Sequence, residues 1–409
     1  MTEEYEMNQS KANENTRCHA LGLHMHQPRN NLRLLIEQEE WEAQQIIRCY
    51  ERVARYAHKY NDVARIHVGF SGILLEQLRD PEIVDRYRKF VDIPAMLNSY
   101  SEAQNIELIG MGYYHPVFPL IPTDDWEEQL VRGRQMIQDV FGREPRGFWP
   151  PEMAFSMEMI PVLKKTGYAY VIVDGVHVKT EKEKHSTDIH QPYLAREQGV
   201  EIQVVPRDRD VSNAQESGMD AGWFQNEIRS RVSSDTAISG PSLITTWSDG
   251  ENGGWFRQMQ EEAGFFGHFF SPFMEDVRRG GAACTPVLLS EFLREHPPET
   301  LADIDTGAWN VGNTSGFDFS QWAETEQQKE AAKKVLELSR RYWNLKKTSI
   351  NDLDRDMLAN ARTLVLECET SCYLFWGDDW LPRLYERTSK AEDLLCVLEN
   401  KYPIKNSPH

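Results

Sequence analysis

The stretch GFWPPEMAFSMEMIPVLKKTGYAYVIVDG, residues 147–175, has the pattern of one strand, one helix and a second strand. The apolar residues 147–149 come before two prolines, and residues 155–165 have helical spacing before Gly167, a residue type that often ends a helix. A second apolar run follows at 169–173. Short apolar runs that alternate with amphipathic segments predict parallel strands joined by helices.

The same alternation extends in both directions from this unit. Residues 126–141, for example, have apolar side chains at helical spacing. Seven short apolar runs are predicted to be strands: 20–23, 64–70, 106–109, 147–149, 169–173, 202–205 and 243–246. We therefore predict an α/β fold in which residues 18–320 form an irregular (β/α)7 catalytic barrel.

The two ends of the chain differ from this central part. Residues 1–17 are polar and are predicted to form a disordered lead-in. Residues 321–409 carry apolar residues at three- and four-residue spacing, which predicts a C-terminal helical bundle. Residues 180–191 are rich in Lys, Glu, His and Thr, and we expect a long surface loop there or a lid over one rim.

Charge and composition exclude several classes of protein. The 409 residues include 45 Lys and Arg against 64 Asp and Glu, a net charge of −19, which repels the phosphates of a nucleic acid. No run approaches the ~20 apolar residues of a membrane span, and the first residues lack the pattern of a secretory signal. The six cysteines form no Cys-x-x-Cys pair. We expect a cytoplasmic protein with reduced thiols that binds neither nucleic acid nor membrane; the oligomeric state stays open.

Polar and aromatic residues follow the predicted strands. Because a parallel barrel places its functional side chains at the carboxyl ends of its strands, we expect them to meet at one rim. These residues are His24, His26, Gln27, Ser71, Tyr114, His115, Trp149, Glu152, Asp174, Arg207, Asp208, Trp247, Asp249, Glu251 and Trp255.

The mixture of carboxylates, histidines and tryptophans fits a carbohydrate site. The C–H faces of sugar rings lie on indoles, while carboxylates and imidazoles bond the hydroxyl groups. Most of the eleven tryptophans are expected in the core. Trp149, Trp247 and Trp255 are the exceptions that we expect to contact sugar.

Glu152 and Asp249 are the candidate catalytic pair, because cleavage of a glycosidic bond usually requires two carboxyl groups. The two prolines before Glu152 restrict its backbone, which favours the role of nucleophile. Asp249 is then the acid that protonates the leaving oxygen. His26 and His115 are expected to contact hydroxyls next to the scissile bond. A carboxyl separation of ~5–5.5 Å predicts retention of configuration, and one of ~6.5–9.5 Å predicts inversion.

A zinc site is an alternative use of His24 and His26. Residues two apart on a strand point the same way, and histidine is a common zinc ligand. Spacing alone identifies no third ligand. We therefore predict no metal and no cofactor.

These residues resemble glycoside hydrolase family 57, an α-glucan-active family that contains amylases, 4-α-glucanotransferases, branching enzymes, amylopullulanases and an α-galactosidase activity. The resemblance covers most of the chain and implies that Glu152 is the nucleophile and Asp249 the acid/base. It also implies a (β/α)7 barrel followed by a three-helix bundle, retention of configuration, and no metal requirement. The four matching motifs are His26-Gln27-Pro28, Gly112-Tyr113-Tyr114-His115-Pro116, Trp149-Pro150-Pro151-Glu152, and Asp249-Gly250-Glu251 followed by Gly254-Trp255.

Three further segments resemble positions of the same family. The resemblance implies that the first two shape the sugar subsites, and that Trp309, Cys372 and Trp376 contact substrate. The family commonly has Asp where this chain has Cys372, and a neutral thiol cannot accept the same charge-assisted hydrogen bonds. Asp378 or Asp379 is a candidate substitute. The segments are Arg207-Asp208 with Ser212, Gly307-Ala308-Trp309, and Glu369-Thr370-Ser371-Cys372-Tyr373 with Phe375-Trp376.

The sequence thus predicts a retaining α-glycosidase or glucanotransferase that acts on starch, glycogen or maltooligosaccharides through a covalent glycosyl-enzyme intermediate. Hydrolysis and transfer share that intermediate and differ in whether water or a sugar hydroxyl intercepts it. Two alternatives stay open. Cys372 suggests a catalytically weak or inactive carbohydrate-binding barrel, and the pair His24 and His26 suggests a metal-dependent deacetylase or α-mannosidase-like hydrolase.

Overall fold

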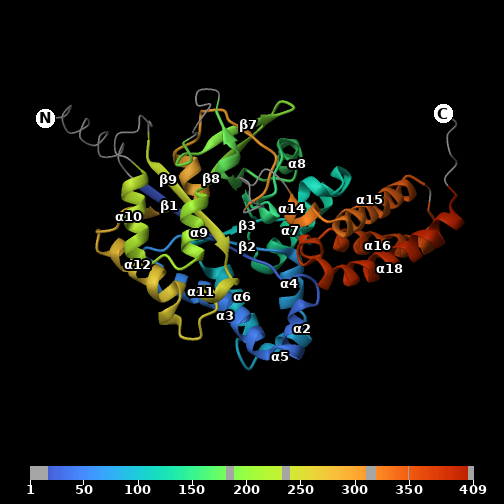
Figure 1. Cartoon of the computed structure of the whole chain (residues 1–409), viewed down its shortest axis with the longest axis horizontal. Helices are drawn as coiled ribbons and strands as arrows, with labels where there is room; N and C mark the ends of the chain where they lie inside the picture. Colours follow the sequence, from blue (N-terminus) through green and yellow to red (C-terminus); the bar gives the residue numbers. More distant parts are fainter. Residues whose placement is uncertain (1–16, 181–187, 233–239, 310–318, 349, 404–409) are drawn as a thin grey trace.

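The computed structural model of the chain describes residues 17–180, 188–232, 240–309, 319–348 and 350–403. Nearly all of the predicted lead-in, and most of the predicted loop at 180–191, lie outside these residues. Figure 1 shows a mixed α/β body that contains the strands, with long helices extending from it at the C-terminal end. In the described ranges, every helix is too short or too polar to cross a lipid bilayer.

The seven predicted strands are confirmed, and they run parallel to one another. The ladders run in the order β9, β1, β2, β3 and in the order β4, β5, β8, and a parallel bridge between Gly110 and Phe148 joins the two sets. The strands are β1 (Arg17–Met25), β2 (Ile66–Phe70), β3 (Ile106–Ile109), β4 (Gly147–Phe148), β5 (Tyr170–Asp174), β8 (Val200–Arg207) and β9 (Ser242–Asp249).

The ring of strands is not closed by a continuous ladder. Among the described residues, β8 and β9 form no ladder with each other. One backbone hydrogen bond crosses this gap, from the N–H of Asp208 to the carbonyl oxygen of Thr245 at 2.9 Å. The barrel is therefore irregular, and its seam lies next to the end of β9.

Four short strands were not predicted. β7 (Tyr193–Glu197) pairs antiparallel with β8, and β10 (Thr285–Pro286) pairs parallel with the start of β1. β6 (Val178–Lys179) and β11 (Asp303–Ile304) form a separate antiparallel pair. Three of these strands have only two residues, too few to carry a periodic pattern.

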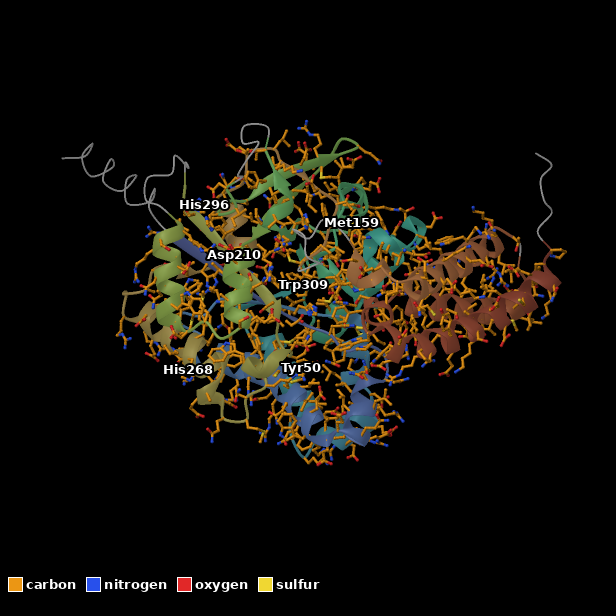
Figure 2. All side chains as sticks on the ribbon, viewed as in Figure 1. Tyr50, Met159, Asp210, His268, His296 and Trp309 are labelled. Carbon is orange, nitrogen blue, oxygen red and sulfur yellow. The ribbon has the colours of Figure 1, made fainter. Side chains whose placement is uncertain are left out.

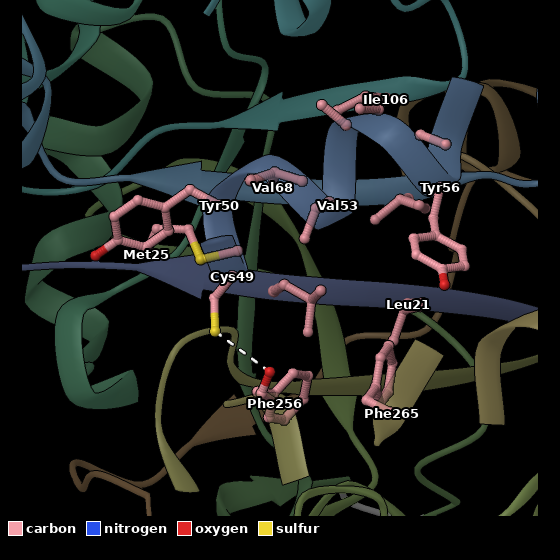
Figure 3. Close-up of a cluster of buried hydrophobic side chains, with 14 of the residues drawn as sticks. Leu21, Met25, Cys49, Tyr50, Val53, Tyr56, Val68, Ile106, Phe256 and Phe265 are labelled. Carbon is pink, nitrogen blue, oxygen red and sulfur yellow. Dashed lines mark hydrogen bonds between the residues drawn. The ribbon is translucent and has the colours of Figure 1, made fainter. Parts of the chain in front are cut away.

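Helices cover the outside of the strands. Figure 3 shows Tyr50 and Val53 of one of them, α3, in a buried cluster with Leu21, Val68 and Ile106 from the first three strands. The helices of this part are α2 (Asn31–Gln38), α3 (Glu40–Lys59), α4 (Gly72–Leu78), α5 (Pro81–Tyr87), α6 (Ile93–Glu102), α7 (Thr123–Phe141), α8 (Ile160–Lys165), α9 (Arg209–Glu216), α10 (Ala221–Arg231), α11 (Gly253–Phe256), α12 (Ser271–Arg278) and α13 (Leu289–Glu295).

The C-terminal part is helical. Three long helices pack through a buried apolar cluster that includes Leu338, Val365 and Leu395, and they form the orange and red group in Figure 1. The long helices are α15 (Glu326–Lys346), α16 (Asp352–Cys368) and α18 (Leu381–Lys401), and the short elements are α14 (Ser320–Ala323), α17 (Ser371–Phe375) and the 3₁₀ segment η7 (Gly377–Asp379).

A buried ion pair joins these helices to the barrel. Nη1 of Arg362 in α16 lies 2.7 Å from Oδ1 of Asp125 in α7, and both side chains are buried. Ser339 and Trp343 of α15 also donate hydrogen bonds to Asp125, at 2.5 and 2.6 Å. The start of α17 contacts the barrel rim directly, because the backbone N–H of Ser371 donates to the His115 carbonyl oxygen at 2.9 Å.

Candidate active site

Glu152 follows β4 in a tight turn. The 3₁₀ segment Pro151–Met153 places Glu152 at φ 59° and ψ 15°, in the left-handed region. This conformation is unfavourable for a non-glycine residue and persists only where the surroundings fix it. Trp309, labelled in Figure 2, supplies two such contacts: its backbone N–H donates to the Glu152 carbonyl oxygen at 2.9 Å, and its Nε1–H donates to Oε2 at 3.0 Å. The carboxylate is therefore held in one direction.

Asp249 is the last residue of β9. Its Oδ1 lies 3.3 Å from Nε2 of His24, and its Oδ2 accepts a hydrogen bond from the Asn252 side chain at 2.6 Å. About a fifth of the side chain, 18%, is exposed. The carboxyl group is thus both oriented by neighbours and open to a ligand.

Two histidines connect Asp249 to Glu152. Nε2 of His24 lies 3.2 Å from Nε2 of His115, and Nδ1 of His115 lies 3.7 Å from Oε1 of Glu152. The two carboxyl groups, far apart in sequence, therefore face the same pair of imidazole rings. Ser371 at the start of α17 completes this group, because its Oγ lies 2.9 Å from Nδ1 of His115.

Burial sets the charge of these groups. Burial raises the pKa of Glu152 to about 7 against a hydrogen bond from Ser371, and nearby Asp249 adds to the rise while Trp309 opposes it. Burial also lowers the pKa of the imidazoles, so the rings are neutral at pH 7. The three rings are those of His24, His26 and His115.

Neutral rings fix the direction of the hydrogen bonds, since each carries one N–H and one acceptor nitrogen. If Nε2–H of His24 donates, Nε2 of His115 accepts and its Nδ1–H donates to Ser371. The Ser371 hydroxyl is then free to donate to Glu152, which agrees with the bond that lowers the pKa of Glu152. In this arrangement Nδ1 of His24 is an acceptor, and it is a buried atom with no partner among the described residues.

His26 packs directly on this group. Its ring stacks on His115 with centroids 3.9 Å apart, and its Nδ1 lies 2.7 Å from Oγ of Ser71, the N-cap of α4. Nε2 of His26 lies 3.3 Å from Sγ of Cys372, and its backbone N–H donates to Oε1 of Glu251 at 2.8 Å. Burial raises the pKa of the Cys372 thiol, so the atom opposite His26 is neutral.

Trp149 and Trp247 lie beneath the site. Their rings stack on each other with centroids 4.9 Å apart, and both are completely buried. Gly22 makes room for them, because a Cβ there would lie 2.0 Å from the Trp247 ring. Their placement differs from the expectation that they contact sugar: neither indole has an exposed face, and Trp149 packs edge-on against His24 with ring centroids 5.8 Å apart.

A buried charge network lies beside the indoles. Asp174 accepts from Arg207 at 3.4 Å and from Arg209 at 2.8 Å, and Nε of Arg207 donates to the Trp247 carbonyl oxygen at 2.7 Å. Asp208 caps α9 and lies 3.1 Å from Nε2 of His190. Asp174 and Arg207 are fully buried and Asp208 nearly so. In this structure these residues bond to one another and to the backbone beneath the site, which is a structural role.

The remaining predicted residues lie further out. Gln27 is buried, 3.5 Å from Glu251, and Tyr114 is buried against Leu366 of the helical part. The ring of Trp255 stacks on His268, and Trp376 is 55% exposed on the helical side.

Asp378 and Asp379 do not take the place of an Asp at position 372. They lie in the exposed η7 segment, whereas Cys372 itself contacts His26. Between Cys372 and η7 the chain completes a turn of α17, which carries the two carboxylates away from the histidines.

Three residues at the site were not singled out by the sequence. Ser371 stands next to Cys372 in a quoted motif and was within reach of that argument. Asn252 lies in the loop after β9, and Glu216 is the last residue of α9. Its pKa is raised to about 7 by burial and by nearby Asp249. No local pattern distinguishes it from the other acidic residues.

The described residues contain no group of three His, Cys, Asp or Glu side chains arranged to hold a metal ion. The ring nitrogens of His24 and His26 that face the site contact Asp249, His115 and Cys372.

Comparison with known proteins identifies relatives of this fold and site. The model of glycosyl hydrolase family 57 matches residues 20–306. Alpha-amylase 1 of Dictyoglomus thermophilum is 26% identical over 302 residues, 71% of this chain and 39% of that protein. The 4-alpha-glucanotransferase of Thermococcus kodakarensis is 26% identical over 318 residues, 74% of this chain and 42% of that protein. The chain thus spans less than half the length of these curated relatives.

Solved structures show the same fold. The 4-alpha-glucanotransferase from Thermococcus litoralis matches with a TM-score of 0.69 and 20% identity over 92% of this chain and 60% of that one. A branching enzyme of the same family from Pyrococcus horikoshii matches with a TM-score of 0.71 and 17% identity over 94% and 88%. The predicted fold class is therefore confirmed.

Proposed function

Because the chain belongs to glycosyl hydrolase family 57, we propose that it is a retaining α-glycosidase or glucanotransferase that acts on α-glucans. One observation carries this proposal: Glu152 and Asp249 face the same histidine pair, His24 and His115. The names of relatives, which include amylases and glucanotransferases, support the substrate class. Starch, glycogen and maltooligosaccharides are the candidate substrates.

In the proposed first step, the Glu152 carboxylate attacks the anomeric carbon while the carboxylic acid of Asp249 gives its proton to the glycosidic oxygen. A bond forms between the Glu152 oxygen and that carbon, and the bond to the leaving sugar breaks. In the second step, Asp249 takes a proton from water or from a sugar hydroxyl, and the oxygen of that molecule attacks the anomeric carbon. The bond from the carbon to Glu152 breaks, so Glu152 is a carboxylate again and Asp249 a carboxylic acid.

The neighbours of Glu152 serve this attack by fixing its direction. Trp309 donates to Oε2 of the carboxylate, and a side-chain hydrogen bond from Ser371 favours its ionised form. A nucleophile held in line with the reacting carbon loses less orientational freedom in the transition state. Asp249 is held by the Asn252 amide, which donates to its Oδ2, and by the His24 ring, which packs against its Oδ1.

Hydrolysis and transfer are separated by one incubation. Maltoheptaose is incubated with the protein and the products are sized, while their anomeric form is followed by NMR. Chains longer than the substrate indicate transfer, and shorter chains alone indicate hydrolysis. First products of β configuration would contradict retention.

Replacement of Glu152 tests the catalytic assignment directly. We expect Glu152→Gln to lower kcat on maltoheptaose by several orders of magnitude, because the amide cannot form the covalent intermediate. Glu158→Gln is the matched control, an exposed glutamate six residues later, and it should leave kcat unchanged. Wild-type kcat in the Glu152 variant removes this residue from the role of nucleophile.

Cys372 supports a second candidate, a barrel that binds α-glucan with little or no turnover. The thiol replaces a charged acceptor opposite His26. In that case wild type binds maltoheptaose in a calorimetric titration without releasing products, and Cys372→Asp gains turnover. Rapid wild-type turnover excludes it.

A further inference from the structure

Helix α9 and the residue before it lie beside β9, and hydrogen bonds join them at matching intervals along the two elements. The backbone N–H of Asp208 bonds the Thr245 carbonyl oxygen at 2.9 Å, and four residues later Oγ of Ser212 accepts from the Trp247 N–H at 3.1 Å. Four helical residues rise ~6 Å, and two strand residues rise ~6.6 Å. The next step of this register brings Glu216 to the level of Asp249.

Electrostatics agrees with this register. Burial and the charge of Asp249 raise the pKa of Glu216, and Arg207 opposes the rise. Strand order gives the side from which Glu216 approaches. His24 of β1, paired with Asp249 of β9, leads through His115 to Glu152, whereas α9 follows β8, which lies on the other side of β9 from β1. Glu216 therefore approaches Asp249 from the side opposite His24.

Packing does not explain this carboxyl group. Glu216 is half-buried, and in the described ranges its carboxylate forms no hydrogen bond or ion pair. A partly buried carboxylate without a partner is unfavourable. Asp210, at the other end of α9 and labelled in Figure 2, instead pairs with Arg231 at 3.3 Å and is 74% exposed.

An indole borders the same place. A Cβ at Gly218, just after α9, would lie 3.9 Å from the Trp255 ring. A carboxylate beside an indole is a common way to hold one sugar ring, because the first accepts from hydroxyls and the second packs on the C–H face.

We propose that Glu216 is a third carboxyl group of the active site and binds a hydroxyl of the sugar on the leaving-group side of Asp249. This inference rests on the proposed function, in which Asp249 protonates the glycosidic oxygen. A group beyond Asp249 then faces the leaving sugar in the first step and the acceptor sugar in a transfer reaction.

Two substrates with different leaving groups distinguish a role in binding the leaving sugar from a general effect on activity. Maltotetraose has a sugar as its leaving group, whereas a nitrophenyl α-maltoside has an aromatic leaving group without hydroxyls. We expect Glu216→Ala to lower kcat/KM on maltotetraose about tenfold or more, the loss typical of a hydrogen bond to a charged group. On the nitrophenyl substrate it should change less than about twofold, and Glu216→Gln should restore most of the activity on maltotetraose, since its amide oxygen still accepts.

Asp210→Asn is the matched control, an acidic residue of the same helix, and it should leave both values unchanged. An equal loss on both substrates, or no loss on either, overturns the proposal for Glu216. If the wild type cleaves neither substrate, the proposed function fails. Calorimetric titration of maltotetraose into wild type and Glu216→Ala then tests whether Glu216 belongs to a sugar-binding site. Weaker binding by the variant supports a sugar site at Glu216, and equal binding overturns it.

Discussion

Glu152 combines two unfavourable features: a left-handed backbone and a carboxyl group that is mostly, though not completely, buried. Both are maintained by Trp309, which bonds its carbonyl oxygen and its carboxylate. The bond from the Trp309 Nε1–H to the carboxylate also lowers the pKa of Glu152, which opposes the effect of burial. The indole N–H therefore controls both the direction and the charge of the proposed nucleophile.

The first prediction concerns pH. Only ionised Glu152 attacks, and its pKa is raised to about 7, so kcat/KM should fall as pH drops through about 7. Trp309→Phe removes a bond to the ionised form and should move the midpoint of this limb to higher pH. Profiles of kcat/KM from pH 4 to 9 measure both. Trp223→Phe, at an exposed tryptophan, is the control, and an unmoved midpoint in the Trp309 variant contradicts the argument.

Position after a strand was enough to predict that Glu152, Asp249 and the histidines lie together, because parallel strands direct their carboxyl ends to one rim. The same rule did not predict which groups are buried. Trp149 and Trp247 also follow strands, yet they fill the space beneath the rim. Glu216 was beyond prediction because its place depends on the register of a helix against a strand, which no local pattern encodes.

At the scale of elements, the apolar runs predicted all seven parallel strands because both faces of such strands are buried. The gap between β8 and β9 was not predictable, since pairing depends on how far the ring twists. One hydrogen bond from Asp208 spans it, and the side chain of Asp208 also caps α9 by accepting from the Val211 N–H at 3.1 Å.

The second prediction uses two helix caps. Asp208→Ala and Asp220→Ala each remove an N-cap, of α9 and α10 respectively, and loss of the cap should lower the free energy of unfolding by about 1 kcal/mol in each. Asp208→Ala also removes the buried partner of His190, so its total loss should be the larger. Only Asp208→Ala should also lower kcat/KM on maltotetraose, because α9 carries Glu216 and contacts Trp247. Urea unfolding and steady-state kinetics measure the two effects. Equal kinetic effects contradict the assigned role of α9.

At the scale of the whole molecule, the helical part completes the site instead of standing apart from it. The spacing of apolar residues predicted helices from residue 321 onward, and three long helices are present. Their contact with the barrel was not predictable, because Asp125 and Arg362 belong to separate amphipathic helices, and sequence patterns do not say which surfaces meet.

The third prediction tests this contact. Arg362→Met leaves the buried Asp125 without its ion pair and should lower the free energy of unfolding by ~3–5 kcal/mol. Arg355→Met on the same helix α16 is the control; its pair with Asp352 is exposed, so the loss should stay below ~1 kcal/mol. Chemical denaturation followed by tryptophan fluorescence compares the two. Similar midpoints for both variants contradict a structural role for the Arg362 pair.

The placement of Ser371 and Cys372 has a consequence for biosynthesis. A ribosome completes every barrel strand before it adds these two residues, so a nascent polypeptide with its ring already assembled still lacks the hydroxyl that orients Glu152. On the mechanism proposed for Glu152, competence is then acquired only after the segment that follows the barrel has been synthesised and α17 docks.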